Sequence, residues 1–199
     1  MLILLTGFYA AADEVWRLRY SALISAENEI TRSSSSDSAE LSTSGHSGSF
    51  VFANGIGLGY SSAKANGNLE EISYKFIYNS LDLSYTTGSS FSFTLGAGRI
   101  INGRGEIILN GVDYVTESVS GESIFLNLGI PFFGGEFLLG YRQDNSEFKN
   151  HQCQMSGKSV ILAEPVKLIS GQINAGIGFF FEYYLLNSCK LSAFCAQSN

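Results

Sequence analysis

The chain has 199 residues, a length that suits one domain, and 45% of them are apolar, enough to build a substantial packed unit. Charged residues make up only 15%, below the roughly 25% of a soluble domain. The formal net charge of −6 argues against the basic footprint of a nucleic-acid-binding protein, so no nucleic acid is expected as a partner. Glycine (22 residues) and aromatics (13%) are frequent and proline occurs only twice, which suits long uninterrupted strands.

Residues 1–12 are uncharged, and a short apolar run in them is followed by three alanines. Small residues after an apolar stretch are typical of a secretory cleavage site, although the basic segment that normally precedes it is missing. We predict a truncated signal peptide at 1–12 and a mature domain over 13–185, with a first strand or a short buried helix as the alternative for 1–12. No later segment reaches the roughly 18 uncharged apolar residues that a membrane-spanning helix needs.

The dominant periodicity of the chain is two, the period of a β-strand. Residues 172–185 show it most clearly, because their odd positions are apolar and their even positions are mostly glycine or polar. Successive side chains of a strand point to opposite faces, so each such segment has one apolar side and one small or polar side. The same alternation predicts eight strands, at about 14–25, 48–60, 70–78, 81–87, 91–101, 122–131, 136–143 and 171–185.

The predicted connections differ strongly in length. Those at 79–80, 88–90 and 132–135 are short, whereas those at 26–47, 102–121 and 144–170 are long. Short turns at one end and long loops at the other are typical of a transmembrane barrel, although the connection at 79–80 is short on the loop side. Residues 26–47 are rich in Ser and Thr and predict a mobile polar loop.

Two of the long connections contain further apolar runs. In the connection at 102–121, Asn110-Gly111 separates two apolar runs, and this pattern strongly predicts a hairpin. This hairpin either stands above the barrel or adds two strands and raises the count to ten, and residues 158–168 raise the same question.

The apolar side of these strands is predicted to face lipid. Almost no charge falls on it, and Trp and Tyr gather near the strand ends, as in the aromatic girdles of membrane barrels. The fold class we predict is therefore all-β: an antiparallel up-and-down transmembrane β-barrel of about eight strands. Inside such a barrel opposite charges can pair, and we expect either a salt-bridged plug or a narrow pore. The predicted lumen charges are Arg17, Arg19, Lys75, Asp82, Arg99, Arg142 and Glu182.

This pattern resembles the small bacterial outer-membrane barrels, such as the eight-stranded OmpA transmembrane domain and OmpX. The resemblance implies a place in the cell outer membrane of a Gram-negative bacterium, contact with its lipid, and insertion by the barrel assembly machinery. In those proteins the last strand carries a polar residue, a glycine and two aromatics that the machinery recognises. Asn174, Gly176, Phe179 and Phe181 match this signature. The tail at 186–199 extends beyond the point where those chains usually end.

Catalytic and metal-binding constellations are not evident in the sequence. His46 and His151 lie in predicted loops and lack the spacing with Ser that lipid A deacylases show. Cys153, Cys189 and Cys195 have no metal spacing, and Cys189 and Cys195 are either bridged or free. We therefore expect no enzyme activity, no cofactor and no metal. The leading hypothesis is a structural or surface-interaction barrel with an unidentified extracellular ligand. A narrow pore and a soluble lipocalin-like barrel, with its apolar face inward, are the alternatives.

Overall fold

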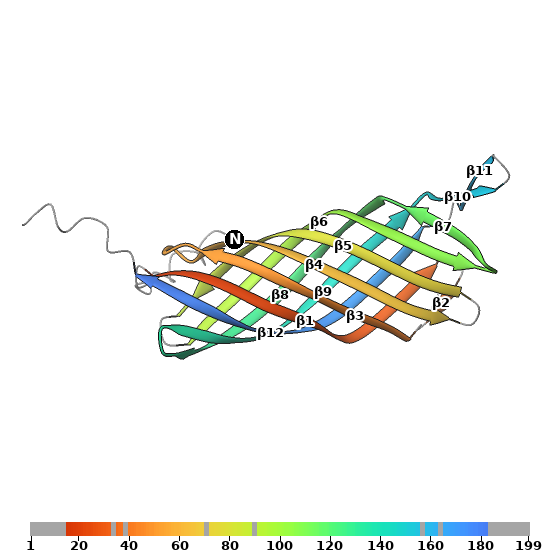
Figure 1. Cartoon of the computed structure of the whole chain (residues 1–199). Coiled ribbons are helices and arrows are strands. Elements are labelled where there is room, and N and C mark those ends of the chain that lie inside the picture. The colour runs from red at the N-terminus through yellow and green to blue at the C-terminus, as the bar shows by residue number, and fades with distance from the viewer. Residues whose placement is uncertain are drawn as a thin grey trace, which may run out of the picture.

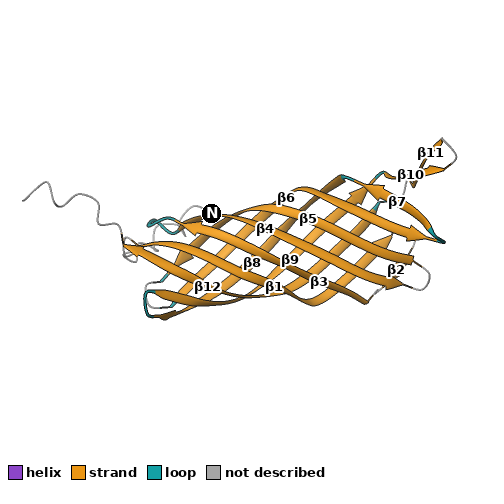
Figure 2. Ribbon diagram, in the orientation of Figure 1, coloured by secondary structure: helices purple, strands orange, loops and turns teal. Residues whose placement is uncertain are grey.

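The computed structural model describes residues 15–32, 35–37, 40–69, 72–88, 91–155, 158–162 and 165–182. The predicted signal peptide at 1–12 and the tail at 186–199 lie outside these residues. The described chain folds as one closed antiparallel barrel, an elongated cylinder of tilted strands (Figures 1 and 2). Its eight wall strands are β1 (Val15–Arg32), β3 (Glu40–Val51), β4 (Ile56–Leu69), β5 (Ile72–Thr87), β6 (Ser92–Leu109), β8 (Ser118–Phe132), β9 (Gly135–Lys149) and β12 (Val166–Glu182).

Neighbouring strands in the wall follow chain order, and pairing of β1 with β12 closes the barrel. Closure leaves the wall strands without the unpaired edges that hydrocarbon does not tolerate. We call one end the turn end, because short connections follow Val51, Thr87 and Phe132 there, with positive φ at Gly55, Gly88 and Gly134. At the other end, the crown, lie four short strands: β2 (Ser35–Asp37), β7 (Val112–Thr116), β10 (His151–Met155) and β11 (Lys158–Leu162).

Eight wall strands were predicted, but several predicted boundaries were wrong. The segment 48–60 holds the turn between β3 and β4, where Asn54 accepts a hydrogen bond from Ile56 and Gly55 has φ 85°. Conversely, Asn79-Ser80 is no turn: β5 runs through it, and only a register shift marks the place. Most of the predicted polar loop at 26–47 is strand, because β1 and β3 extend far beyond the predicted barrel wall.

The structure answers the question of eight or ten strands. Asn110 and Gly111 both have positive φ, at 51° and 75°, which a tight two-residue hairpin turn requires. The hairpin joins β6 to β7, and β7 pairs with the upper part of β6 beyond the stretch that pairs with β8. Likewise β11 pairs only with β10. These strands therefore extend the crown and do not enter the closed wall.

In the half of the wall nearer the turn end, apolar side chains point outward. Leu83, Leu95 and Ile124 are each 60–61% exposed, while serines and threonines on the same strands are buried inside. On β1 and β12 this apolar band spans Trp16–Ile24 and Ile173–Phe181, each close to the 9–11 residues of a membrane-crossing strand. The lipocalin-like alternative, which needs the apolar face inside, is therefore wrong for this half.

Toward the crown the polarity of the wall inverts. On β5, Tyr74, Phe76 and Tyr78 are at most 2% exposed and point inward, whereas Lys75 and Ile77 point outward. They belong to a core that fills the crown half of the lumen. The other fully or nearly buried members of this core are Ile30, Leu41, Ala63, Ala65, Ile100, Ile107, Phe148, Val166 and Leu168.

Two β-bulges help to produce this inversion, because one extra residue in a strand flips the facing of every side chain beyond it. In β6 the register skips Ile101 opposite the Asn79–Ser80 step, so that Ile107 points inward and Arg104 outward. In β1 the shift between Ser25 and Glu27 has the same effect and turns Ile30 into the core.

We predict that the neighbouring residues Phe76 and Ile77 respond oppositely to truncation. Phe76→Ala should lower the free energy of unfolding by about 3–5 kcal/mol, because it removes a buried ring that stacks 4.4 Å from that of Phe148. Ile77→Ala should change it by less than about 1 kcal/mol, since its side chain faces water. Urea unfolding of the chain folded in detergent micelles measures both. A larger loss for Ile77→Ala than for Phe76→Ala would contradict the inversion.

Candidate functional site

The half of the lumen nearer the turn end, called the lower half from here on, holds two groups of charged side chains. The first group lies close to the turns. Glu136, on β9 just after the turn, accepts hydrogen bonds from Arg19 Nε at 2.7 Å and Arg17 Nη1 at 3.3 Å. Arg19 also donates to three hydroxyls, those of Ser92, Thr86 and Thr94. We call these six residues the Glu136 cluster.

A glycine at position 178 makes the contact between Arg19 and Glu136 geometrically possible. In the register of the wall, Gly178 of β12 lies directly between Arg19 of β1 and Glu136 of β9. A Cβ at Gly178 would approach Glu136 Cγ to 2.8 Å and Arg19 Cγ to 3.1 Å, closer than side chains normally pack. The missing side chain lets the arginine reach across a whole strand to its carboxylate.

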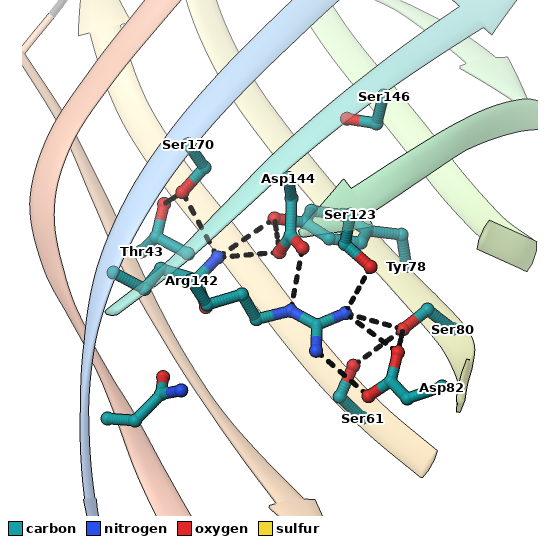
Figure 3. A network of polar contacts seen from close by, with 12 residues as sticks. Thr43, Ser61, Tyr78, Ser80, Asp82, Ser123, Arg142, Asp144, Ser146 and Ser170 are labelled. Carbon is teal, nitrogen blue, oxygen red and sulfur yellow. Dashed lines mark hydrogen bonds and ion pairs between the residues drawn. The ribbon is translucent and has the colours of Figure 1, made fainter. Parts of the chain in front are cut away.

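The second group centres on Arg142 of β9 (Figure 3). Its Nη1 lies 2.8 Å from Asp82 Oδ2 and its Nε 2.7 Å from Asp144 Oδ1. Nη2 donates to the hydroxyls of Ser80 and Ser123 at 2.6 and 2.7 Å. Every nitrogen of the guanidinium therefore has a partner, and the side chain is only 2% exposed. We call this the Arg142 cluster.

A second layer of polar groups fixes the carboxylates of the Arg142 cluster. Asp144 Oδ2 accepts hydrogen bonds from the Tyr78 hydroxyl at 3.0 Å and from Gln172 Nε2 at 2.8 Å. Gly98 again leaves the space, because a Cβ there would lie 2.0 Å from Asp82 Oδ1 and 2.5 Å from Ser123 Oγ. Buried charges held by this many hydrogen bonds avoid the cost of an unpaired ion.

The two clusters compensate each other in charge. Arg17 and Arg19 against Glu136 leave one positive charge, and Arg142 against Asp82 and Asp144 leaves one negative charge. Together the three arginines and three carboxylates are neutral. A cavity of about 20 Å³, lined by Arg19, Asp82 and Arg142 among others, lies between them. That volume holds about one water molecule.

Of the predicted lumen charges, Arg17, Arg19, Asp82 and Arg142 point inward and are at most 8% exposed. Lys75 and Arg99 differ from the prediction, because both are exposed on the outer wall. Lys75 lies in the inverted part of β5, and Arg99 shares the outward parity of Leu95 and Phe93. The side chain of Glu182 lies outside the described residues.

The sequence analysis missed two members of the network, Glu136 and Asp144. Both have the parity of Arg142 on β9, so extending that alternation by one step toward the turn and one toward the crown would have placed them inside. Glu136 is the first residue of the strand predicted at 136–143, and Asp144 lies one residue beyond the end of that strand.

The four residues of the predicted assembly signature all lie on β12. Asn174 points inward and donates to Asn127 at 3.0 Å, and Gly176 packs against Ser21 of β1. Phe179 and Phe181 point outward and are 49% and 51% exposed. β12 also pairs with both β1 and β9, which places the signature at the seam where the barrel closes.

The histidines and the described cysteine take separate places. His46 is in β3, on the outer wall, stacked on Tyr20 with ring centroids 6.3 Å apart. His151 is buried in β10, and Cys153 carries a buried free thiol two residues later. Among the described residues, no three His, Cys, Asp or Glu side chains converge as metal ligands. In the same part of the chain, no helix is long and apolar enough to span a membrane.

Comparison with solved structures finds barrels of the outer membrane. The Neisserial surface protein A (NspA) has a TM-score of 0.55 and 15% identity, over 84% of this chain and 97% of that chain. Ail, the attachment invasion locus protein of Yersinia pestis, gives 0.46 and 15%, over 84% and 99%. The outer membrane protease OmpT of Escherichia coli gives 0.43 and 9%, over 86% and 98%.

Neither the comparison with family models nor that with curated proteins gives a match. At this level of identity the likeness to NspA concerns the fold, and a shared fold does not by itself assign an activity. The chain has the fold of a small outer-membrane β-barrel with eight strands in its wall.

Proposed function

We propose that the chain is a closed barrel of the bacterial outer membrane that acts through its outer surface and crown, as a structural or surface-interaction protein. The observation that carries this proposal is the filled lumen. Side chains of the Glu136 and Arg142 clusters occupy the lower half, and an apolar core occupies the crown half.

The charges in the lumen are compatible with a pore, but the side chains that fill the lumen leave no open path along its axis. An ion that moves along the axis would have to pass the apolar side chains of Phe76, Phe148 and Leu168, each 0% exposed. It would also have to break the ion pairs of the two clusters, whose carboxylates and guanidinium groups already bind one another. Narrow barrels of about eight strands generally hold side chains and little else.

The apolar band supports a membrane location. It covers the wall around the turn-end half, while charges such as Lys64 and Glu147 appear on the outer wall only nearer the crown. In outer-membrane barrels the short turns face the periplasm and the long loops the outside. By that convention the crown is extracellular, and the signature on β12 is a candidate contact for the assembly machinery.

The proposal assigns no catalysis to the chain. A catalytic base needs a nucleophile or a substrate within hydrogen-bond reach. His46 instead stacks on Tyr20 in the outer wall, and the buried carboxylates Asp82, Asp144 and Glu136 are each bound by arginine.

The membrane location predicts the behaviour of the expressed chain. The protein should leave the membrane fraction only with detergent, because the outward apolar band needs lipid or its substitute. Its gel mobility should differ between unheated and boiled samples, since the closed wall resists detergent until it is heated. Release of folded protein into buffer, with no mobility shift, would contradict the proposal.

The filled lumen predicts the absence of ion conduction. Reconstituted in planar bilayers, the chain should give no discrete openings above the bare bilayer. Arg142→Ala should lower its thermal stability and leave the current at baseline, because the apolar core still blocks the axis. Discrete openings whose conductance changes with Arg142→Ala would establish a pore instead.

The same model predicts that Glu136 stabilises the barrel. Glu136→Gln removes the buried carboxylate that Arg19 binds at 2.7 Å and Arg17 at 3.3 Å and should lower the free energy of unfolding by about 3–5 kcal/mol. The matched control is Glu147→Gln, which removes an exposed partner of Lys149 at 2.7 Å and should cost at most about 1 kcal/mol. Urea titration in micelles compares the free energies of unfolding of the two variants. Equal losses would show that the Glu136 cluster stabilises the barrel no more than an exposed ion pair does.

A further inference from the structure

The outer wall between the apolar band and the crown carries a group of basic side chains on β4, β5 and β6. Lys64, Lys75, Arg99 and Arg104 are all exposed there, and we call them the cation face. The strand register brings three of them close together, because Lys64 and Arg104 lie on either side of Ile77 and Lys75 is two residues along from it.

A hollow of about 310 Å³ lies within the cation face, lined by Lys75, Ile77, Arg104 and Glu106. Glu106 neutralises little of the charge, since its carboxylate is 3.9 Å from Lys75 Nζ and the lysine side chain is 51% exposed. Such exposed pairs are weak. Arg104 and Lys64 make no ion pair with any residue that the structure describes. The hollow therefore offers cationic groups that an anion can reach.

The rest of the outer wall at this height differs in sign. Glu27 and Glu29 on β1 and Glu147 on β9 point outward there, and Glu122 on β8 lies beside Arg99 in the register of β6 and β8. Of the exposed cations on that side, Lys149 is already bound to Glu147 at 2.7 Å. Of the six exposed basic side chains described on the wall strands, four thus lie on β4, β5 and β6, and the other two are Lys149 and Lys167.

The cation face begins where the apolar band ends. Arg99 pairs in register with Leu81, the last outward leucine of β5, and Lys64 lies four residues beyond Tyr60 on β4. At about 3.3 Å per residue along a tilted strand, this is the level of lipid headgroups, and long basic side chains can bend back toward it. Phosphates are the anionic groups that lie at this level in a membrane.

We propose that the cation face binds the phosphorylated sugar headgroup of a lipid in the surrounding leaflet. The hollow is larger than a lone phosphate needs, and it combines one apolar side chain with two exposed cations. Its charge complements a phosphate, and its position complements a ligand whose acyl chains pack along Leu81 and Tyr60. The inference rests on the proposed membrane location.

The test uses the full chain in phosphatidylcholine vesicles that contain a small fraction of a diphosphorylated glycolipid, lipid A, as the probe. After extraction into mild detergent, native mass spectrometry counts the glycolipids bound per barrel. The variant is Lys75→Gln with Arg104→Gln, and the matched control is Lys149→Gln with Lys167→Gln, which removes two exposed cations from β9 and β12. Only samples with a heat-dependent mobility shift are compared, so a failure of binding is separate from a failure of insertion.

Each basic side chain near an anionic surface changes the binding constant about fivefold, so the variant with Lys75→Gln and Arg104→Gln should bind the glycolipid about 25-fold more weakly. The control should stay within about twofold of the unmodified chain. Equal losses in the two variants would overturn the proposal, because they would show unspecific attraction. Equally strong binding of dephosphorylated lipid A would also overturn it. So would displacement of the lipid by millimolar inorganic phosphate, since that would indicate a site for a soluble anion.

Discussion

Each outward side chain of the wall must match the solvent that it meets, and in the proposed membrane location this solvent changes from lipid to water partway along every strand. A strand has only two faces. Where its outward face is polar, its apolar side chains therefore have to point inward. On β5 the mainly apolar face is the inward one up to Tyr78 and the outward one from Leu81 onward. The apolar core of the crown half and the charged lumen of the lower half are therefore two consequences of one boundary.

The boundary also explains why the lower lumen needs buried charges. With its apolar residues committed to the lipid side, this half must fill its interior with polar groups, and buried polar groups are stable only when each has a partner. The wall satisfies this requirement for its charges by pairing Arg19 with Glu136 and Arg142 with Asp82 across strands, and Arg142 with Asp144 along β9. Glycine leaves the space for the pairs that reach across strands. Gly178 separates Arg19 from Glu136, and Gly98 makes room for Asp82. Glycine at these two positions thus lets long side chains reach one another across a narrow lumen.

The fold class could be predicted from the sequence because the lower half obeys a simple rule of alternation. The facing of Arg17, Arg19, Asp82 and Arg142 follows from it. The same rule failed for Lys75, since it assumed that apolar means outward along the whole strand. The strand boundaries failed for a different reason. Asn54-Gly55 is a turn, whereas Asn79-Ser80 is continuous strand opposite the bulge at Ile101, and short polar breaks of this kind look alike in a sequence without their pairing partners.

The filled interior of the barrel limits the surfaces that can bind a partner. The interior is committed to stability: its charges cancel, its hydroxyls are bound, and its upper part is packed with rings that exclude water. What remains available is the outer wall near the crown and the crown itself, where exposed side chains such as Lys75 and Arg104 are not held by strong partners. In the proposed membrane location, the filled cylinder holds those surfaces at a fixed height relative to the lipid. Because the apolar band sets that height, the same residues that hold the barrel in lipid also determine which layer of headgroups its basic side chains can reach.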